Sequence, residues 1–289
     1  MIQVSGMVFQ QSDKWLAGSI ESVIIQRMMN DPAVYSYPSI DELEFELKLR
    51  KNIIASARAM NQGDAQFESF ENSRCNPDYW HLTSAGGFRI RQDVLPSAAI
   101  QDIFTNSSLY AYECAVAKVI IFYHAVLNTI NEHLFNQLFQ NLYLYSWNAD
   151  PDLGIQIIDT LHFLPGDVVY FNNPDFNPAT SWWRGENAVD LGDGTYFGHG
   201  IGIRTAEQMI QALNEMRRPG SIQSAYLLTE VARPSFNYLA RLSLSSRSYH
   251  SYKVQHAIIH HHESSISCKH YLFYLDQFYL HISNTGNPI

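Results

Sequence analysis

Apolar residues recur every three or four positions between residues 39 and 60, the spacing that places side chains on one face of an amphipathic helix. The positions that set this period are Leu43, Leu47, Ile54 and Ala57. Ser39 is followed three residues later by Glu42, which is the pattern of a capping box. We therefore expect a helix that begins just after Ser39 and buries its apolar face.

A second amphipathic pattern covers residues 205–217. Thr205 and Gln208 form another capping box at its start, and Pro219 and Gly220 are typical stop signals just beyond its end. This stretch predicts a surface helix that buries one face.

The stretch from residue 107 to residue 130 differs from both, because it is apolar almost all round. A helix of this kind is buried on most sides, and Ser107 or Ser108 is its expected cap. Residues 109–127 have the length of a membrane span, but they contain ionisable side chains that are costly in lipid, namely Glu113, Lys118 and His124. A buried core helix, and no membrane span, is the better interpretation.

Strand patterns lie between the helical segments. A Pro-Gly-Asp turn leads into a β-rich run at residues 162–171, and residues 187–203 form a hairpin pattern around a Gly-Asp-Gly turn. Shorter strands are expected at residues 87–91, 142–147 and 225–231. Helices mixed with antiparallel strands along one chain predict an α+β domain.

The pattern changes after about Arg241. Helical periodicity fades, and aromatic runs such as YLFYLDQFYL lack polar alternation. Seven of the twelve histidines fall in this tail, at positions 250, 256, 260, 261, 262, 270 and 281. Adjacent histidines converge poorly on one tetrahedral ion, so no metal site is expected there. We expect residues 1–241 to form one folded domain and residues 242–289 to be a poorly ordered tail.

Composition narrows the classes of partner. The 289 residues, 46% of them hydrophobic, can bury a sizeable core, and the formal net charge of −9 argues against a nucleic-acid partner. The three cysteines, Cys75, Cys114 and Cys268, are too few for a disulfide framework, and no charged leader with an apolar run stands at the N-terminus. We expect free thiols and synthesis in a reducing cytoplasm.

Cys114 is the candidate nucleophile. It lies near the start of the buried helix, where the helix dipole and backbone N–H groups stabilise a thiolate and lower the pKa of the thiol. The alternative is that Cys114 is a small core residue, which is the commoner role of a buried free cysteine. A nucleophilic cysteine also needs a base and a group that orients the base.

His199 is the best candidate for that base. It is flanked by Gly198 and Gly200 on the second arm of the predicted hairpin, where glycines allow another group to approach closely. Glu186 lies thirteen residues earlier, just before the first arm. The hairpin therefore predicts that Glu186 and His199 are neighbours in space.

Two other ionisable residues are weaker candidates. His124 lies ten residues after Cys114 on the same helix, so roughly 15 Å separate them along its axis. Glu113 adjoins Cys114, but successive helical side chains point about 100° apart, so it cannot simply face the thiol. Glu113 either bonds to the base or is an ordinary acid at a helix N-terminus.

Four strings of the sequence resemble the spore-associated protein-glutamine gamma-glutamyltransferases of endospore-forming bacteria. They are YAYECAVAKVIIFYHA, FLPGDVVYFNNPDF, WRGENAVDLGDGTYFGHGIGI and QSAYLL, and the resemblance runs from the N-terminus to about Arg241. The turn and strand PGDVVYF after a cysteine helix also resemble papain-like cell-wall peptidases. The resemblance implies a papain-like core, in which the cysteine helix packs on an antiparallel sheet, with additional N-terminal helices. It leaves residues 242–289 outside the family pattern.

The resemblance also implies catalytic roles for individual residues. Cys114, in YECA, matches the nucleophile of the family. Glu186, in WRGEN, matches the acid that works with it, and His199, in FGHGIG, matches the active-site histidine. Glu113 matches a second acid that partly substitutes for Glu186.

The implied reaction is acyl transfer from a protein glutamine to a lysine amine through a cysteinyl thioester. Trp147 and Trp183 match aromatic positions that line the substrate passage, and we assign Asn187 to substrate binding with them. Backbone N–H groups at the start of the cysteine helix are the expected oxyanion donors. No cofactor is implied. We expect calcium-independent activity, because the nearest calcium-loop pattern, residues 148–154, lacks the required Gly and Glu.

By the same resemblance the partners are spore coat proteins, which supply the glutamine and lysine side chains. The enzyme is expected in the mother-cell cytoplasm and then in the spore coat. Two alternatives stay open. A papain-like site that admits water would be a cysteine peptidase or amidase with the same residues. A chain with a dead site would be a non-catalytic coat protein, although the intact set of Cys114, Glu186 and His199 argues against that.

Overall fold

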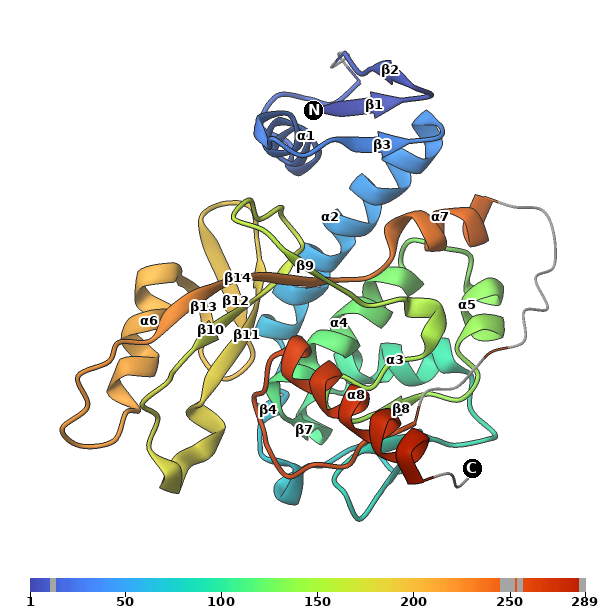
Figure 1. Ribbon diagram of the computed structural model, residues 1–289. Coiled ribbons are helices and arrows are strands. Elements are labelled where there is room, and N and C mark those ends of the chain that lie inside the picture. The colour runs from blue at the N-terminus through green and yellow to red at the C-terminus, as the bar shows by residue number, and fades with distance from the viewer. Residues whose placement is uncertain (11–13, 245–252, 254–256, 286–289) are drawn as a thin grey trace.

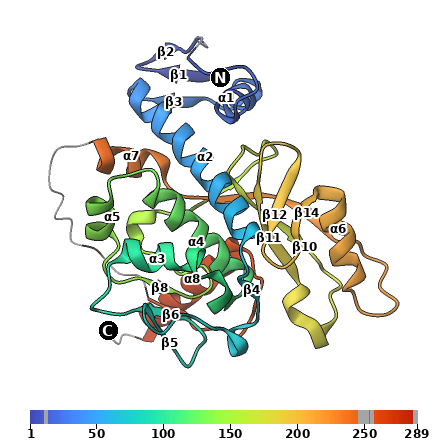
Figure 2. The same ribbon diagram turned by 180° about the vertical axis from the view of Figure 1, so that it is seen from behind.

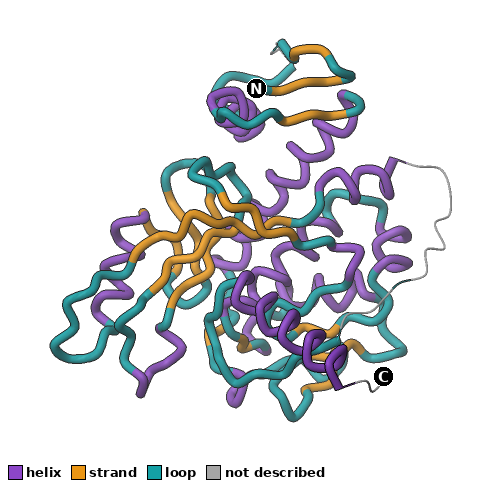
Figure 3. The backbone as a smooth tube through the Cα atoms, viewed as in Figure 1, coloured by secondary structure: helices purple, strands orange, loops and turns teal. Residues whose placement is uncertain are grey.

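A six-stranded antiparallel sheet lies at the centre of the computed structural model, which describes residues 1–10, 14–244, 253 and 257–285. The strand order is β13-β12-β11-β10-β14-β9, and every neighbouring pair is antiparallel. The strands are β9 (Gln156–Asp159), β10 (Val168–Asn172), β11 (Gly185–Asp190), β12 (Thr195–Gly198), β13 (Gly202–Thr205) and β14 (Tyr226–Arg233). Figure 3 shows these strands in orange beside the helical part of the molecule.

Helices cover both faces of this sheet. On one face α4 (Cys114–Leu127) packs against β11, with α2 (Ile40–Gln62) beside it (Figures 1 and 2). On the other face lies α6 (Ala206–Glu215). Side chains alternate along a strand, so Val168 joins the core around α4 whereas Val169 packs with α6. The fold is therefore α+β, with the cysteine helix on an antiparallel sheet, as the sequence predicts.

The other elements surround this framework. Helices α3 (Pro96–Thr105) and α5 (Glu132–Leu138) pack against α4, while α7 (Phe236–Leu244) packs against α2. Two small sheets lie near the start of α4: the first pairs β4 (Gln66–Phe67) with β7 (Ala111–Tyr112), and the second contains β5 (Trp80–Leu82), β6 (Phe88–Ile90) and β8 (Tyr143–Leu144). Short 3-10 helices occupy residues 70–72, 107–109, 151–153 and 178–183.

The N-terminal residues form a small unit at the start of α2, drawn in dark blue at the top of Figure 1. It contains β1 (Ile2–Val4), β2 (Met7–Val8), β3 (Tyr35–Tyr37) and α1 (Ile20–Asn30). A separate core of Ile24, Ile25, Leu43, Leu47 and Leu164 joins this unit to α2. The family resemblance implies additional N-terminal helices, and the structure has α1 here together with the three strands.

Both capped helices are confirmed. The Ser39 hydroxyl accepts the backbone N–H of Glu42 over 3.3 Å, and α2 begins at Ile40. The Thr205 hydroxyl and the Gln208 side chain form both bonds of the capping box at the start of α6. These predictions hold because a cap is encoded within four consecutive residues.

The predicted start of the cysteine helix is wrong. The helix begins at Cys114, and the cap is Glu113 rather than Ser107 or Ser108. Residues 107–109 form a 3-10 turn and Ala111–Tyr112 form a strand before the helix. The extended backbone of Glu113 allows its side chain to accept N–H groups of the first helical turn, so it replaces a shorter polar cap. In the described part of the chain, no helix has both the length and the hydropathy needed to cross a membrane.

Part of the tail packs on the core. Helix α8 (Cys268–Thr285) covers the stretch whose helical period was not recognised, and Figure 1 shows it in red in front of the cysteine helix. The residues just before it run through the interior; the buried ones are Ser264, Ser265, Ile266 and Ser267, and Cys268, which begins α8, is buried too. The boundary at residue 241 stays a prediction, and the expectation of poor order falls partly on residues 245–252, 254–256 and 286–289, which lie outside the described residues.

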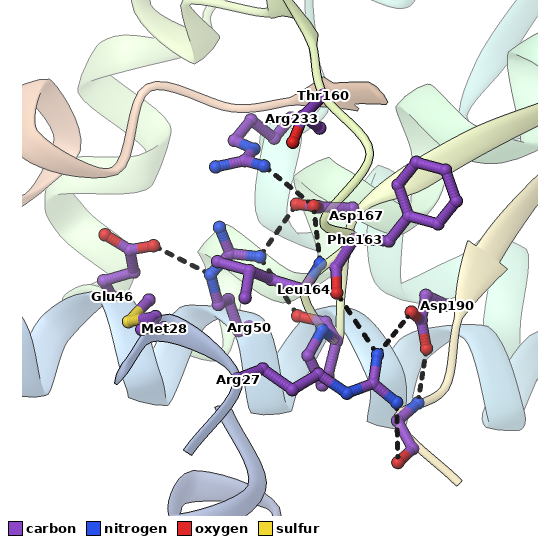
Figure 4. Close-up of polar contacts among 12 residues, drawn as sticks. Arg27, Met28, Glu46, Arg50, Thr160, Phe163, Leu164, Asp167, Asp190 and Arg233 are labelled. Carbon is purple, nitrogen blue, oxygen red and sulfur yellow. Dashed lines mark hydrogen bonds and ion pairs between the residues drawn. The ribbon is translucent and has the colours of Figure 1, made fainter. Parts of the chain in front are cut away.

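A buried ion-pair network ties the Pro-Gly-Asp turn to α2 and β14 (Figure 4). The guanidinium of Arg50, on α2, donates to Asp167 and Glu46 over 2.8 Å each. Asp167 also accepts from Arg233 of β14 over 2.8 Å and from the backbone N–H of Leu164 over 3.0 Å. The network fixes the point at which β10 enters the sheet, and β10 lies directly beside β11, which carries the candidate acid.

Candidate active site

Cys114 is the first residue of α4 and is completely buried. The side-chain Nδ2 of Asn187, on β11, donates a hydrogen bond to its Sγ over 3.2 Å. Burial raises the pKa of the Cys114 thiol well above its ordinary value, and the nearby carboxyl groups of Glu186 and Glu113 raise it further. The expectation of a lowered thiol pKa is wrong for this arrangement, because loss of water outweighs the helix dipole.

Glu113 caps the cysteine helix. Its two carboxylate oxygens accept the backbone N–H groups of Ala115 and Val116, each over 2.9 Å, and the backbone N–H of Ser265 over 3.1 Å. Burial raises the pKa of Glu113, whereas these three donors lower it. Because Ala115 and Val116 already donate to Glu113, they are not free to bind an oxyanion, and that prediction is wrong for both.

Glu186 lies on β11 and faces the β12–β13 turn, as the hairpin predicts. A Cβ added to Gly198 would come 2.7 Å from the Glu186 Cγ, and one added to Gly200 would come 3.2 Å from Oε2. A side chain at position 198 would therefore displace this carboxyl group, and one at position 200 would crowd it. Its Oε1 is buried and has no hydrogen-bond partner in the described part of the chain. Burial raises the pKa of Glu186 to about 7, although the charge of Lys118 and the backbone of Gly200 and His199 lower it.

Lys118 is a fully buried cation one helical turn after Cys114. Its ammonium group donates to the backbone oxygen of Phe197 over 3.2 Å and lies 4.6 Å from the centre of that ring. Burial lowers the pKa of Lys118, whereas the charges of Glu186, Cys114 and Glu113 raise it. Lys118 is thus the positive group that faces the buried carboxylates and the thiol.

His199 is held by the small sheet at the start of α4. Its Nε2 lies 3.1 Å from the carbonyl oxygen of Gln66, to which it donates, and its ring stacks on Tyr112 at 4.7 Å. Burial lowers the pKa of His199 to about 3, and the charge of Lys118 lowers it too, so the imidazole is neutral. The contacts of this ring are with Gln66, Phe67 and Tyr112.

A peptide carbonyl group from the tail lies beside the thiol. The carbonyl oxygen of Ile266 accepts the indole N–H of Trp147 over 3.1 Å and the side-chain N–H of Asn187 over 2.9 Å. The same Asn187 nitrogen donates to Cys114. The phenol of Tyr170, which is paired with Asn187 across β10 and β11, donates to the carbonyl oxygen of Ser265 over 2.8 Å. The site therefore binds a peptide amide next to a cysteine sulfur.

Comparisons with known proteins agree with this chemistry. A family model described as protein-glutamine gamma-glutamyltransferase matches residues 1–243. The protein-glutamine gamma-glutamyltransferase of Halalkalibacterium halodurans is 50% identical over 278 residues, which cover 95% of this chain and 97% of that protein. The chain belongs to the protein-glutamine gamma-glutamyltransferase family. The enzyme of the same name from Bacillus mycoides is 48% identical over 210 residues, covering 73% of this chain and 76% of that protein.

A solved structure supports the fold of this transglutaminase. It is described as transglutaminase from Geobacillus stearothermophilus without C-terminal extension, and it is 49% identical with a TM-score of 0.69. It covers 72% of this chain and 100% of its own. The family model ends near the boundary expected from the sequence, whereas the match to Halalkalibacterium halodurans continues well into the tail. The tail of this transglutaminase therefore has a counterpart in that relative.

The remaining substrate-site prediction concerns Trp183. Its ring is half-buried and stacks on Phe67 with 6.0 Å between centroids. Phe67 also contacts His199, at 6.2 Å. Trp183 thus belongs to the aromatic group around the β12–β13 turn, whereas Trp147 contacts the amide beside the thiol.

Sequence reasoning missed two residues of the site. Lys118 follows Cys114 by one helical turn, so the spacing of a lysine within an otherwise apolar helix is a usable signal. Tyr170 lies in the β-rich run PGDVVYF, where an aromatic residue is ordinary. Only the pairing of β10 with β11, which sets Tyr170 opposite Asn187, shows that it belongs to the site, so no local sequence pattern could have identified it.

Proposed function

We propose that this transglutaminase transfers acyl groups through Cys114, which attacks the γ-carboxamide of a protein glutamine and releases ammonia to leave a thioester. A lysine ε-amine then attacks the thioester, forms an isopeptide bond and frees the thiol. The observation that carries this proposal is the pair of N–H groups from Trp147 and Asn187 that holds an amide oxygen beside the sulfur. Donors at this range stabilise the oxyanion of a tetrahedral intermediate.

Glu186 is the group best suited to move protons. Burial raises its pKa to about 7, which is close to the optimum for a group that both accepts and returns protons near neutral pH. In the first half it takes the proton of the thiol and gives it to the leaving nitrogen. In the second half it takes a proton from the attacking amine. Lys118 compensates the negative charge on the carboxylate and thiolate in both halves.

His199 positions Glu186 in this proposal. Its neutral imidazole is fixed between Gln66 and Tyr112, and it is flanked by the glycines that contact the carboxyl group. Replacing the ring would let the β12–β13 turn move and would change the place of Glu186. Trp183 and Phe67, at the same turn, are proposed to line the substrate passage.

We further propose that the reaction is independent of calcium. Asp150 and Asp152, the carboxylates of the nearest calcium-loop pattern, lie 2.9 and 2.7 Å from the ammonium group of Lys253. Asp150 also caps the short turn that follows it, and Asp152 accepts the phenol of Tyr238. A lysine and local donors thus occupy these oxygens.

The substrates we propose are spore coat proteins, which would supply both the glutamine and the lysine. The proposed location is the mother-cell cytoplasm followed by the spore coat. Both rest on the resemblance of the motifs around Cys114, Glu186 and His199 to spore-associated members of the family.

Amine incorporation tests the reaction. The purified protein, as the full chain and as a chain that ends at residue 244, is incubated with a glutamine-containing protein and a labelled primary amine, with a chelator present, beside Cys114→Ala variants of both. We expect labelled product and released ammonia from the protein with Cys114, most of all from the shortened chain, and neither from the variants. Loss of turnover on chelation, restored by calcium, would contradict the calcium-free reaction.

The same assay separates the alternatives. Formation of glutamate without incorporated label would identify a hydrolase that uses the same nucleophile. Label incorporated equally well by Cys114→Ala would remove Cys114 from the mechanism.

A further inference from the structure

The tail enters the active site by its main chain. Three successive contacts hold it there: the Ser265 N–H donates to Glu113, the Ser265 carbonyl accepts from Tyr170, and the Ile266 carbonyl accepts from Trp147 and Asn187. These hydrogen bonds recognise the peptide backbone and not a particular side chain. Ser265 and Ile266 are buried as completely as Cys114 itself.

Ion pairs fix the segment on both sides of these contacts. Before it, Glu263 pairs with Arg184, which follows Trp183. After it, Lys269, in the first turn of α8, lies 3.0 Å from Asp159 and 3.1 Å from Glu230 at the edge of the central sheet. The segment is therefore held across the site by one ion pair before it and two after it.

The arrangement in which the tail covers Cys114 has unfavourable features. Ser265 has a φ of 61°, a left-handed conformation that is unfavourable for a residue with a Cβ. Glu186 Oε1, also buried, has no hydrogen-bond partner among the described residues. A cavity of about 260 Å³ remains between α8 and the loop that follows Trp147. Strain, an unpaired polar atom and incomplete packing all lower the cost of releasing the segment.

We propose that residues 263–269 act as an intramolecular pseudosubstrate, whose Ile266 peptide group occupies the place of a glutamine carboxamide and keeps Cys114 closed until the tail is displaced. This inference rests on the proposed function for the identity of the mimicked group. The closed thiol is inaccessible and protonated. Displacement of the tail admits solvent and substrate, and the N–H groups of Trp147 and Asn187 become free to bind the carboxamide oxygen.

Alkylation of Cys114 by iodoacetamide tests the closure independently of transfer. The modified Cys114 peptide is quantified by mass spectrometry, because Cys75 and Cys268 are also free thiols. The variants are Ile266→Asp, which places a charge at a buried, apolar position of the tail, and His262→Asp, which introduces an aspartate at an exposed position of the tail. We expect Ile266→Asp to speed alkylation at least ~10-fold, because the rate follows the population of open molecules. His262→Asp should match the unaltered chain.

A second variant is needed because Ile266→Asp, a change at a buried position, could misfold. The double reversal Glu263→Lys with Lys269→Glu breaks the ion pairs on both sides of the segment and replaces only side chains that are at least partly exposed. A chain that ends at residue 244 is a third, and the solved relative without its C-terminal extension supports its folding. Faster alkylation in either supports the closure. Equal alkylation rates in the unaltered chain, the double reversal and the shortened chain would overturn it. Faster alkylation without any amine incorporation would leave the closure standing and would contradict the proposed transferase reaction.

Discussion

Trp147 donates its indole N–H to the carbonyl oxygen of Ile266 over 3.1 Å, although 119 residues separate the two in the chain. The contact joins the loop after β8 to the tail, at the atom next to the candidate nucleophile. It therefore has two consequences, one for the reaction and one for the closed state.

Trp147→Phe removes the donor and keeps most of the ring. In the chain shortened at residue 244 we expect kcat for amine incorporation to fall roughly 10²–10³-fold, the usual effect of losing one oxyanion donor. In the full chain the same change weakens the hold on Ile266 and should speed alkylation of Cys114. Trp183→Phe is the matched control, and we expect it to change kcat less than about tenfold because its ring lies at the β12–β13 turn. Equal losses in the two variants would argue against the donor role.

Substitutions of Glu186 and Glu113 should have different effects, because Glu186 transfers protons whereas Glu113 caps a helix. Glu186→Gln keeps the shape of the side chain, so we expect little change in unfolding but a fall of about 10²–10⁴ in kcat, the range of general acid–base catalysis. Glu113→Ala leaves two N–H groups of α4 without their partner and should lower the free energy of unfolding by about 1–2 kcal/mol. Urea unfolding and amine incorporation, measured on both variants, check the division. A larger catalytic loss in Glu113→Ala than in Glu186→Gln would reverse the assignment.

The parts of this structure that the sequence predicts are those with local signals. The caps at Ser39 and Thr205 lie within four residues of their partners, and the turn after Asp190 fixes the hairpin that brings Gly198 and Gly200 to Glu186. A family resemblance then supplied the role expected of Cys114, which its position alone left open between a nucleophile and a core residue.

The parts that were not predicted depend on contacts between distant segments. Glutamate is not a favoured helix cap, so local preference favours Ser107 or Ser108, and only the fold reveals that Glu113 also bonds to the tail. The helix dipole alone predicts a lowered pKa for the thiol, but burial of Cys114 and the charges of Glu186 and Glu113 raise it. The serines around Ile266 have no pattern that indicates a buried segment.

Lys118 should control the pH dependence of the reaction. Its positive charge lowers the pKa of Glu186, so Lys118→Met should raise that pKa. If the carboxylate form is the active one, the acid limb of the kcat profile then moves to higher pH, by roughly one unit or more. Profiles of the chain shortened at residue 244, with and without Lys118→Met and measured with the same amine, check the shift. A limb that stays in place, or moves to lower pH, would contradict the pairing of Lys118 with Glu186.

Asp167 should contribute more to stability than any exposed carboxylate. It is fully buried, pairs with Arg50 and Arg233, and accepts the backbone N–H of Leu164 (Figure 4). Asp167→Asn leaves both guanidinium groups without their shared negative partner, and we expect the free energy of unfolding to fall by about 3–5 kcal/mol. The partners of Asp167 are Arg50, Arg233 and Leu164, outside the group around Cys114, so activity should fall only as far as the folded fraction falls.

Asp193→Asn is the matched control, since Asp193 pairs with Arg58 at the surface, where the two side chains are 50% and 41% exposed. Its loss should change the free energy of unfolding by less than about 1 kcal/mol. Urea denaturation of both variants gives the comparison of stability. Their kcat is measured without urea and is expressed per folded molecule. Similar stability losses at the two positions would mean that desolvation of the Arg50 network already cancels its attraction, in which case the turn is held by packing and not by charge.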